Sequence, residues 1–103
     1  MPVAEIPEFA QRVLDVVESI PPGRVMAYGD IAEFLCEGGP RQVGRVMSHW
    51  GGGVPWHRVV HADGKPAPCH DGEAVRLLRA DRTPMRGDRV DMRAARWDGV
   101  RRK

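Results

Sequence analysis

The sequence lacks the long apolar run that a membrane-spanning helix requires. Such a span takes ~20 consecutive apolar residues, and no hydrophobic stretch of this chain approaches that length. The N-terminus also lacks the basic-then-apolar order of a secretory signal peptide. With 42% hydrophobic and 29% charged residues, the chain is expected to be globular and to have no membrane partner.

Cysteine is scarce as well. The two cysteines, Cys36 and Cys69, are too few for a disulfide framework. Proteins without such a framework are typical of reducing compartments, so we expect this one in the cytoplasm.

Lysine occurs only at Lys65 and Lys103, so arginine supplies nearly all of the positive charge. Residues 1–40 hold two basic and seven acidic side chains, a net charge of −5, whereas residues 41–103 hold fourteen basic and seven acidic ones, a net charge of +7. The planar, permanently charged guanidinium suits phosphate. The asymmetry therefore favours a polyanionic partner, but a GC-rich genome, whose codons favour arginine, would produce the same composition on an ordinary solvated surface.

Four segments have the apolar spacing or the flanking residues of helices. They are Ile6–Ile20, Tyr28–Cys36, Arg41–Trp50 and Glu73–Asp81. In the second of them, Phe34 is expected on the apolar side together with Ile31, Ala32 and Leu35. Short strands are expected at 24–26 and 58–61, and the alternation at 89–97 predicts one or two more.

A glycine-containing turn joins the second and third predicted helices, which is the outline of a helix-turn-helix. Pro40 suits the first turn of the third helix. Gly44 lies inside that helix, where glycine costs ~1 kcal/mol relative to alanine, and this suggests the close approach of another backbone. We expect residues 1–103 to form one mainly α-helical domain with a few short β-strands, similar to a winged helix-turn-helix.

The residue types that bind metals do not form a metal site in this sequence. His57 and His61 would lie ~13 Å apart on a strand. The adjacent Cys69 and His70 lack the paired spacing of structural zinc sites. We predict no metal and no cofactor.

The segment Val54–Val60, VPWHRVV, places Trp56 directly before a His-Arg pair and after three glycines. A cysteine or serine next to His57 could serve as a nucleophile activated by a base, but an indole offers no such group. Trp56 is therefore either an anchor of the core or the wall of a pocket in which no nucleophilic reaction starts.

Three motifs resemble the DNA-binding domain of O6-alkylguanine-DNA alkyltransferases. They are IPPGRVMAYGDIAEFL, PRQVGRVM and VPWHRVVHADG, and the resemblance covers about residues 9–81. Members of that family carry Pro-Cys-His-Arg-Val, and the cysteine accepts the alkyl group irreversibly. A tryptophan at this position is the mark of the alkyltransferase-like proteins, which bind alkylated DNA without repairing it. The arginine-rich tail, 82–103, has no such counterpart and can be interpreted only from its charge.

The resemblance implies roles for individual residues. Tyr28 would help to rotate the target nucleotide out of the duplex, Arg41 would enter the stack in its place, and Trp56 would line the lesion pocket. The expected lesion pocket consists of Trp56, Tyr28, Pro55, His57 and Arg58, and the expected DNA-binding surface of Arg41, Tyr28, Gln42, Gly44 and Arg45. The residues alone leave open that Tyr28 packs beneath the first helix, that Arg41 is an ordinary surface residue, and that Arg58 forms a structural salt bridge.

The chain departs from the family pattern at three places. The family commonly has glutamate after the Leu-Leu of the late helix, so the carboxylate partner of His57 would be Asp81 or absent. Ala27 stands where serine or threonine would cap the second helix. The loop 64–72 is shorter than in most relatives, which puts the range of accepted alkyl groups in doubt.

The function implied by the resemblance is a non-enzymatic sensor of O6-alkylguanine. It would dock its helix-turn-helix in the minor groove, flip the nucleotide, bend the DNA, shield the lesion and flag it for nucleotide excision repair. The expected partners are double-stranded DNA carrying the lesion and nucleotide excision repair proteins. We expect a monomer in the cytoplasm of a bacterium, on the nucleoid when bound. Two alternatives remain, an active alkyltransferase that uses Cys36 or Cys69 and a helix-turn-helix transcription regulator.

Overall fold

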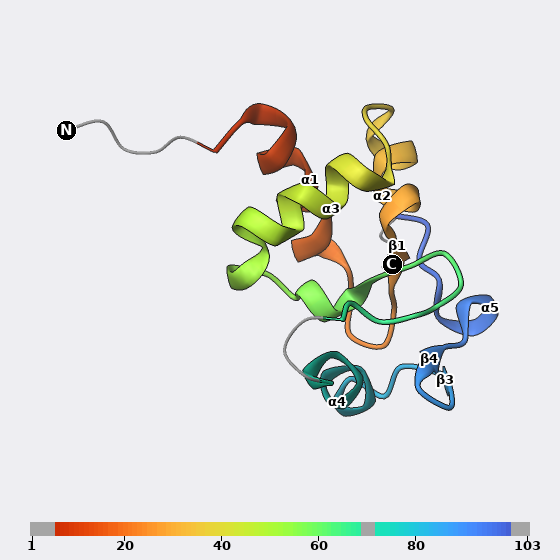
Figure 1. Cartoon of the computed structure of the whole chain (residues 1–103). Helices are drawn as coiled ribbons and strands as arrows, with labels where there is room; N and C mark the ends of the chain where they lie inside the picture. Colours follow the sequence, from red (N-terminus) through yellow and green to blue (C-terminus); the bar gives the residue numbers. More distant parts are fainter. Residues whose placement is uncertain (1–5, 69–71, 100–103) are drawn as a thin grey trace.

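A computed structural model of the chain describes residues 6–68 and 72–99 (Figure 1). Its elements in chain order are α1 (Glu8–Ser19), β1 (Met26–Ala27), α2 (Tyr28–Leu35), α3 (Pro40–Trp50), the 3-10 turns η1 (Gly51–Gly53) and η2 (Trp56–Arg58), β2 (Val59–Val60), α4 (Glu73–Ala80), β3 (Met85–Arg86), β4 (Arg89–Val90) and α5 (Met92–Ala95). The protein is mainly helical with a few short strands, as the sequence predicts, and the four predicted helices are confirmed as α1 to α4. In the part of the chain that the structure describes, no helix has the length and apolar character needed to cross a membrane.

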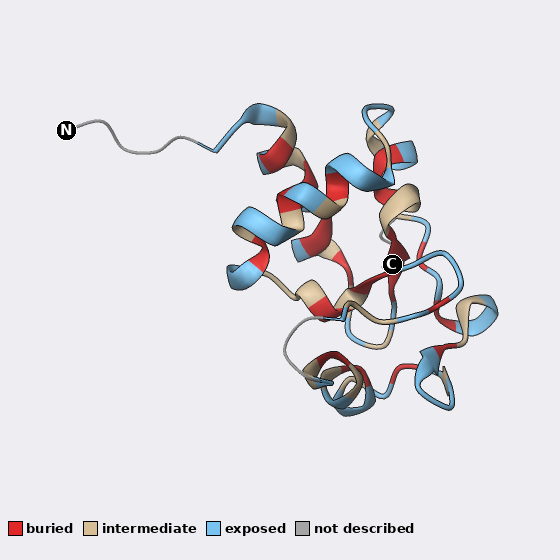
Figure 2. Cartoon of the chain, in the orientation of Figure 1, coloured by how far each residue is buried: buried red, intermediate tan, exposed pale blue. Residues whose placement is uncertain are grey.

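The helices α1, α2 and α3 pack against one another. The helix α1 places five side chains in the core because they recur on one face of the helix. They are Ala10, Val13, Leu14, Val16 and Val17. Proline at 21 and 22 follows the end of α1, where it cannot continue the helix. Figure 2 shows the exposed positions of α3 along its outward side, so this helix presents a polar face to solvent.

The strands β1 and β2 are parallel, with Met26 opposite Val59 and Ala27 opposite Val60. All four residues are buried. Because the strands run in the same direction, the start of α2 at Tyr28 lies beside the residue that follows β2, His61. The predicted strand 58–61 is thus shorter than expected, and His57 lies in η2 and not on a strand with His61.

The tail differs from its prediction. The strands β3 and β4 form an antiparallel hairpin, but Met92–Ala95 is a helix, so the expectation of strands alone over 89–97 is wrong. The reason is local, because the Asp91 side chain accepts a hydrogen bond from the Arg93 N–H at 3.2 Å and caps the helix.

Two further expectations are corrected by packing. Phe34 is 48% exposed and does not belong to the core, because α2 turns Ile31 and Ala32 inward instead. Within residues 6–68 and 72–99, no other backbone closely approaches Gly44, because a Cβ atom at this position would have the ring of Tyr28 as its neighbour, at 4.0 Å.

Candidate functional site

A cavity of about 540 Å³ lies beside the C-terminal half of α3. Pockets that hold small organic groups have volumes of about 300–1,000 Å³. The wall contains Tyr28 from α2, the η2 residue Trp56, and residues of α3, η1 and the loop after β2, namely Gly44, Met47, Ser48, His49, Gly51, Gly52, Ala67 and Pro68. Of the five residues expected in the lesion pocket, Trp56 and Tyr28 line this cavity, and Pro55, His57 and Arg58 do not.

The turn η2 explains why Trp56 lines the cavity whereas its neighbours His57 and Arg58 do not. A 3-10 turn rotates successive side chains by about 120°, and the turn is closed by a hydrogen bond from the Arg58 N–H to the Pro55 carbonyl, at 3.0 Å. Trp56 consequently lines the cavity, while His57 is buried at 8% exposure. The two rings meet edge to face with their centroids 6.1 Å apart.

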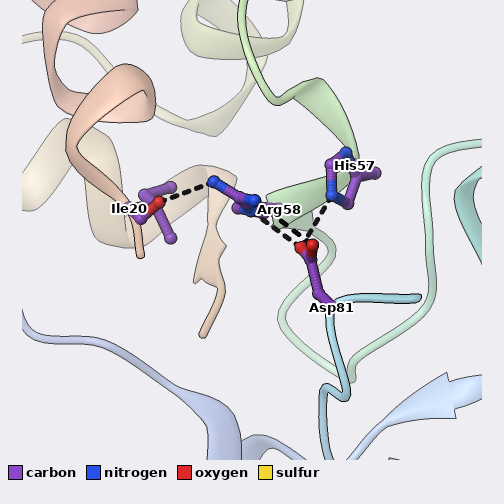
Figure 3. Close-up of polar contacts among 4 residues, drawn as sticks. All are labelled: Ile20, His57, Arg58 and Asp81. Carbon is purple, nitrogen blue, oxygen red and sulfur yellow. Dashed lines mark hydrogen bonds and ion pairs between the residues drawn. The ribbon is translucent and has the colours of Figure 1, made fainter. Parts of the chain in front are cut away.

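His57 and Arg58 both bind Asp81, at the end of α4 (Figure 3). The Asp81 Oδ2 atom lies 2.8 Å from His57 Nε2 and 2.8 Å from Arg58 Nε, and Arg58 Nη2 donates to Oδ1 at 3.2 Å. Arg58 Nη1 also donates to the Ile20 carbonyl at 3.0 Å. The three side chains of the ion pairs are only 10–15% exposed. The carboxylate partner of His57 is thus Asp81, which reaches the ring despite its short side chain.

This cluster sets the ionisation of Asp81. Burial acts to raise the pKa of the carboxyl, but the hydrogen bonds from Arg58 and His57 outweigh it and hold the pKa below its ordinary value. Arg58 is consequently committed to a structural ion pair, the alternative that the sequence left open.

Arg58 lines a second and larger cavity, of about 800 Å³, which does not include Trp56. Its lining combines three arginines with the acidic residues Glu18 and Asp98, and it includes no residue of α2 or α3. The smaller cavity beside Trp56 is therefore the better candidate site, because its described lining has no acidic residue and it adjoins the polar face of α3.

The exposed face of α3 carries Arg41 and Arg45, four residues apart and so on the same side of the helix. Among the described residues, neither guanidinium has a hydrogen-bond or ion-pair partner. Gln42 is used differently, because its Oε1 accepts the Gly39 N–H at 3.0 Å and so caps the start of α3. Gly44 lies in the wall of the cavity. The permanent charges of Arg41 and Arg45 are thus available to bind a polyanion.

Tyr28 connects this face with the cavity beside Trp56. It also lines a neighbouring cavity of about 610 Å³, together with Asp30, Arg41 and His61. The rings of Tyr28 and His61 lie 5.2 Å apart and are tilted by 51°. Sequence reasoning missed His61 here. The signal that could have found it is the parallel pairing of β1 with β2, which places the residue after β2 next to the first residue of α2.

The remaining candidates lie elsewhere. Cys36 is exposed at the end of α2 and does not line the cavity beside Trp56. Cys69 and His70 lie outside the described residues. Within residues 6–68 and 72–99, no three His, Cys, Asp or Glu side chains are grouped as metal ligands.

The chain is similar in sequence and in fold to several known proteins. The family described as 6-O-methylguanine DNA methyltransferase, DNA binding domain, matches residues 8–82. The DNA base-flipping protein of Escherichia coli K12 is 35% identical over 98 residues, which cover 87% of this chain and 74% of that protein. Alkyltransferase-like protein 1 of Schizosaccharomyces pombe is 45% identical over 62 residues, covering 55% of this chain and 56% of that protein. The crystal structure of S. pombe Atl1 in complex with damaged DNA containing O6-carboxymethylguanine is similar with a TM-score of 0.76 at 26% identity, over 91% of this chain and 98% of that chain.

Proposed function

Because the chain belongs to the family of 6-O-methylguanine DNA methyltransferase DNA-binding domains, we propose that it binds duplex DNA carrying O6-alkylguanine and leaves the alkyl group in place. The observation that carries the proposal is the indole of Trp56 in the wall of a cavity beside α3, where two arginines have no partner among the described residues. The modified nucleotide leaves the duplex and enters this cavity.

Extrusion is favoured by the chemistry of the lesion. A base inside the duplex presents only part of its edge, and rotating it out costs a few kcal/mol. An O6-alkyl group weakens base pairing and so lowers this cost. Trp56 and Met47 offer apolar surface to the alkyl group, and Arg41 fills the place that the base has left in the stack. Tyr28, between the cavity and Arg41, acts on the backbone of the rotated nucleotide.

The absence of alkyl transfer follows from the identity of residue 56. A transferase needs a thiolate next to the alkyl carbon, and none of the described residues that line the cavity carries a thiol. His57 is turned toward Asp81 at 2.8 Å and holds the 56–58 turn in place. The alternative enzyme that uses Cys36 has the weakness that this residue lies at the end of α2, outside the cavity wall.

The same proposal extends to the assembly on DNA. The helix α3 enters the minor groove, the inserted side chain is accompanied by bending of the duplex, and the bound protein shields the lesion until nucleotide excision repair proteins take it over. The protein acts as a monomer in the bacterial cytoplasm, on the nucleoid.

The test is a binding measurement with two matched duplexes, of which one carries a single O6-methylguanine, at a stated salt concentration. We expect tighter binding to the modified duplex, and recovery of the lesion unchanged after incubation. Equal affinity for both duplexes would remove the lesion from the function and favour the transcription regulator, which would instead discriminate between sequences. Appearance of unmodified guanine would make the protein an alkyltransferase.

Replacing Arg41 with alanine is expected to weaken binding to the modified duplex about tenfold more than binding to the plain duplex, because the side chain stabilises only the state with the nucleotide rotated out. The measurement is the ratio of the two dissociation constants. The matched control is Arg45→Ala, one turn along the same face, which as a phosphate contact should weaken both complexes equally. If Arg41→Ala weakened binding to both duplexes equally, Arg41 would be a phosphate contact like Arg45.

A further inference from the structure

The C-terminal segment 92–97, here called the strap, lies outside the residues that match the family, 8–82. It nevertheless runs alongside the start of the helix-turn-helix (Figure 1). The Val25 N–H donates to the Ala95 carbonyl at 3.0 Å, and the Trp97 N–H donates to the Val25 carbonyl at 2.8 Å. Ala95 and Trp97 are buried, so the backbone of the residue between them is fixed beside β1.

That residue is Arg96, and its side chain reaches α2. Arg96 Nε donates to Asp30 Oδ2 at 2.9 Å, and Nη2 donates to Oδ1, so the guanidinium grips the carboxylate with two parallel hydrogen bonds. The Asp30 side chain is 14% exposed and that of Arg96 is 60% exposed. The pKa of Asp30, which burial acts to raise, is lowered on balance by Arg96 and by the Ala27 N–H. The carboxylate is therefore charged and bound at neutral pH.

The same carboxylate closes the start of α2. Asp30 Oδ2 accepts the Ala27 N–H at 3.0 Å, and Tyr28 is the residue that follows. Ala27 itself has no side-chain oxygen with which to cap the helix, so the contact from Asp30 holds the 27–28 junction without help from a capping hydroxyl. Tyr28 is the first residue of α2, so its backbone belongs to this junction.

We propose that Arg96 is a positioning residue for Tyr28. By holding the Asp30 carboxylate against the Ala27 N–H, Arg96 fixes the start of α2 and with it the place of the Tyr28 ring between the two cavities. The strap in this way contributes to DNA binding, although it lies outside the residues 8–82 that the family model matches. The consequence for lesion binding rests on the proposed function, whereas the positioning step does not.

The composition of the chain offers a direct probe, because Tyr28 is its only tyrosine. Protein labelled with 3-fluorotyrosine gives one fluorine NMR resonance, which reports on this ring alone. In the free protein, Arg96→Ala is expected to shift or broaden the resonance, and Arg96→Lys, which keeps the charge and one donor, to restore much of it. The matched control is Arg93→Ala, an exposed residue of α5 whose side chain pairs with no other described residue. It should leave the resonance in place.

The second readout is DNA binding, at a temperature at which circular dichroism shows every variant to be folded. Arg96→Ala is expected to lower the preference for the O6-methylguanine duplex over the plain duplex about threefold to fivefold, as suits an ion pair that is partly exposed. Arg93→Ala should leave this preference unchanged.

The outcomes separate the two proposals. An unchanged Tyr28 resonance in Arg96→Ala overturns the positioning role, whatever the DNA does. A changed resonance with an unchanged preference overturns its consequence for recognition. If the wild-type protein shows no preference for the lesion, the proposed function fails, and the resonance alone decides the positioning role.

Discussion

Replacing Asp81 with alanine is expected to lower the free energy of unfolding by about 3 kcal/mol or more. The change leaves the guanidinium of Arg58 without its carboxylate at a site where the side chain is only 15% exposed. It also removes the partner of His57, whose side chain is 10% exposed. Removing one member of a buried ion pair is costly because the other charge stays desolvated. Urea denaturation at neutral pH measures the effect.

The control for this change is Asp88→Ala. Asp88 also pairs with an arginine, Arg79, but the two side chains are 81% and 57% exposed. Exposed pairs contribute about 0–1 kcal/mol, so this variant should unfold at nearly the same urea concentration as the wild type. Similar losses of unfolding free energy in both variants would mean that burial does not strengthen the contribution of the Asp81 ion pairs.

The Asp81 contribution should also depend on pH. Its pKa in the folded protein is lower than the ordinary value, so the unfolded chain binds the proton more readily. The stabilisation is therefore complete above the unfolded-state pKa, about 4, and is lost as the pH falls through the lower folded-state pKa. The difference between the wild type and Asp81→Ala should narrow below about pH 4. A difference that stays constant to lower pH would exclude the ionised pair as its source.

Trp56→Cys is expected to transfer the alkyl group slowly or not at all, although it recreates the Pro-Cys-His-Arg-Val motif. The His57–Asp81 contact at 2.8 Å is in place, so the missing feature is not the carboxylate partner of the histidine. The obstacle is the fit of the pocket. The cavity is shaped around an indole, and a much smaller side chain leaves a void in which the alkyl carbon is held loosely. A misplacement of about 1 Å can cost roughly a hundredfold in rate.

Mass spectrometry of Trp56→Cys after incubation with O6-methylguanine DNA measures the transfer. Trp56→Ala is the matched variant, because it removes the same indole without adding a thiol. Both variants should bind the lesion more weakly than the wild type and to a similar degree, with a slow methylation or none in Trp56→Cys. Rapid, stoichiometric methylation of the introduced cysteine would show that the rest of the site can catalyse alkyl transfer and that Trp56 alone prevents it.

Local sequence patterns predict much of this fold and part of the site. The helices α1 to α4 follow from apolar spacing and from their flanking prolines and glycines, and the Trp56 motif predicts a pocket wall without a nucleophile. The helix α5 escaped prediction because the loose alternation of 89–97 was favoured over the capping residue Asp91. Phe34 was misplaced because the spacing on α2 does not distinguish the buried side from its border.

The long-range parts of the site have no local signal. The Asp30–Arg96 pair joins residues 66 positions apart, and the contact of His61 with Tyr28 depends on the register of strands only two residues long. The sequence left open whether Arg58 forms a structural salt bridge. The packing of η2 against α4 shows that it does, with Asp81 as its partner. Residue types and spacing cannot fix such pairings, because the intervening chain can bring many other arginines to the same carboxylates.

The pairing of the strap with β1 has a consequence for biosynthesis. Arg24 donates to the carbonyl of Arg96, 72 positions later, and Trp97 packs in the same core cluster as α1. At roughly 5–20 residues per second, a ribosome takes roughly 4–14 s to add that much chain. Throughout this interval the N–H and carbonyl of Val25 lack their hydrogen-bond partners, and the core beneath α1 lacks Trp97. The nascent segment α1 to α3 therefore lacks these stabilising contacts until residues 95–97 have been synthesised and have left the ribosome.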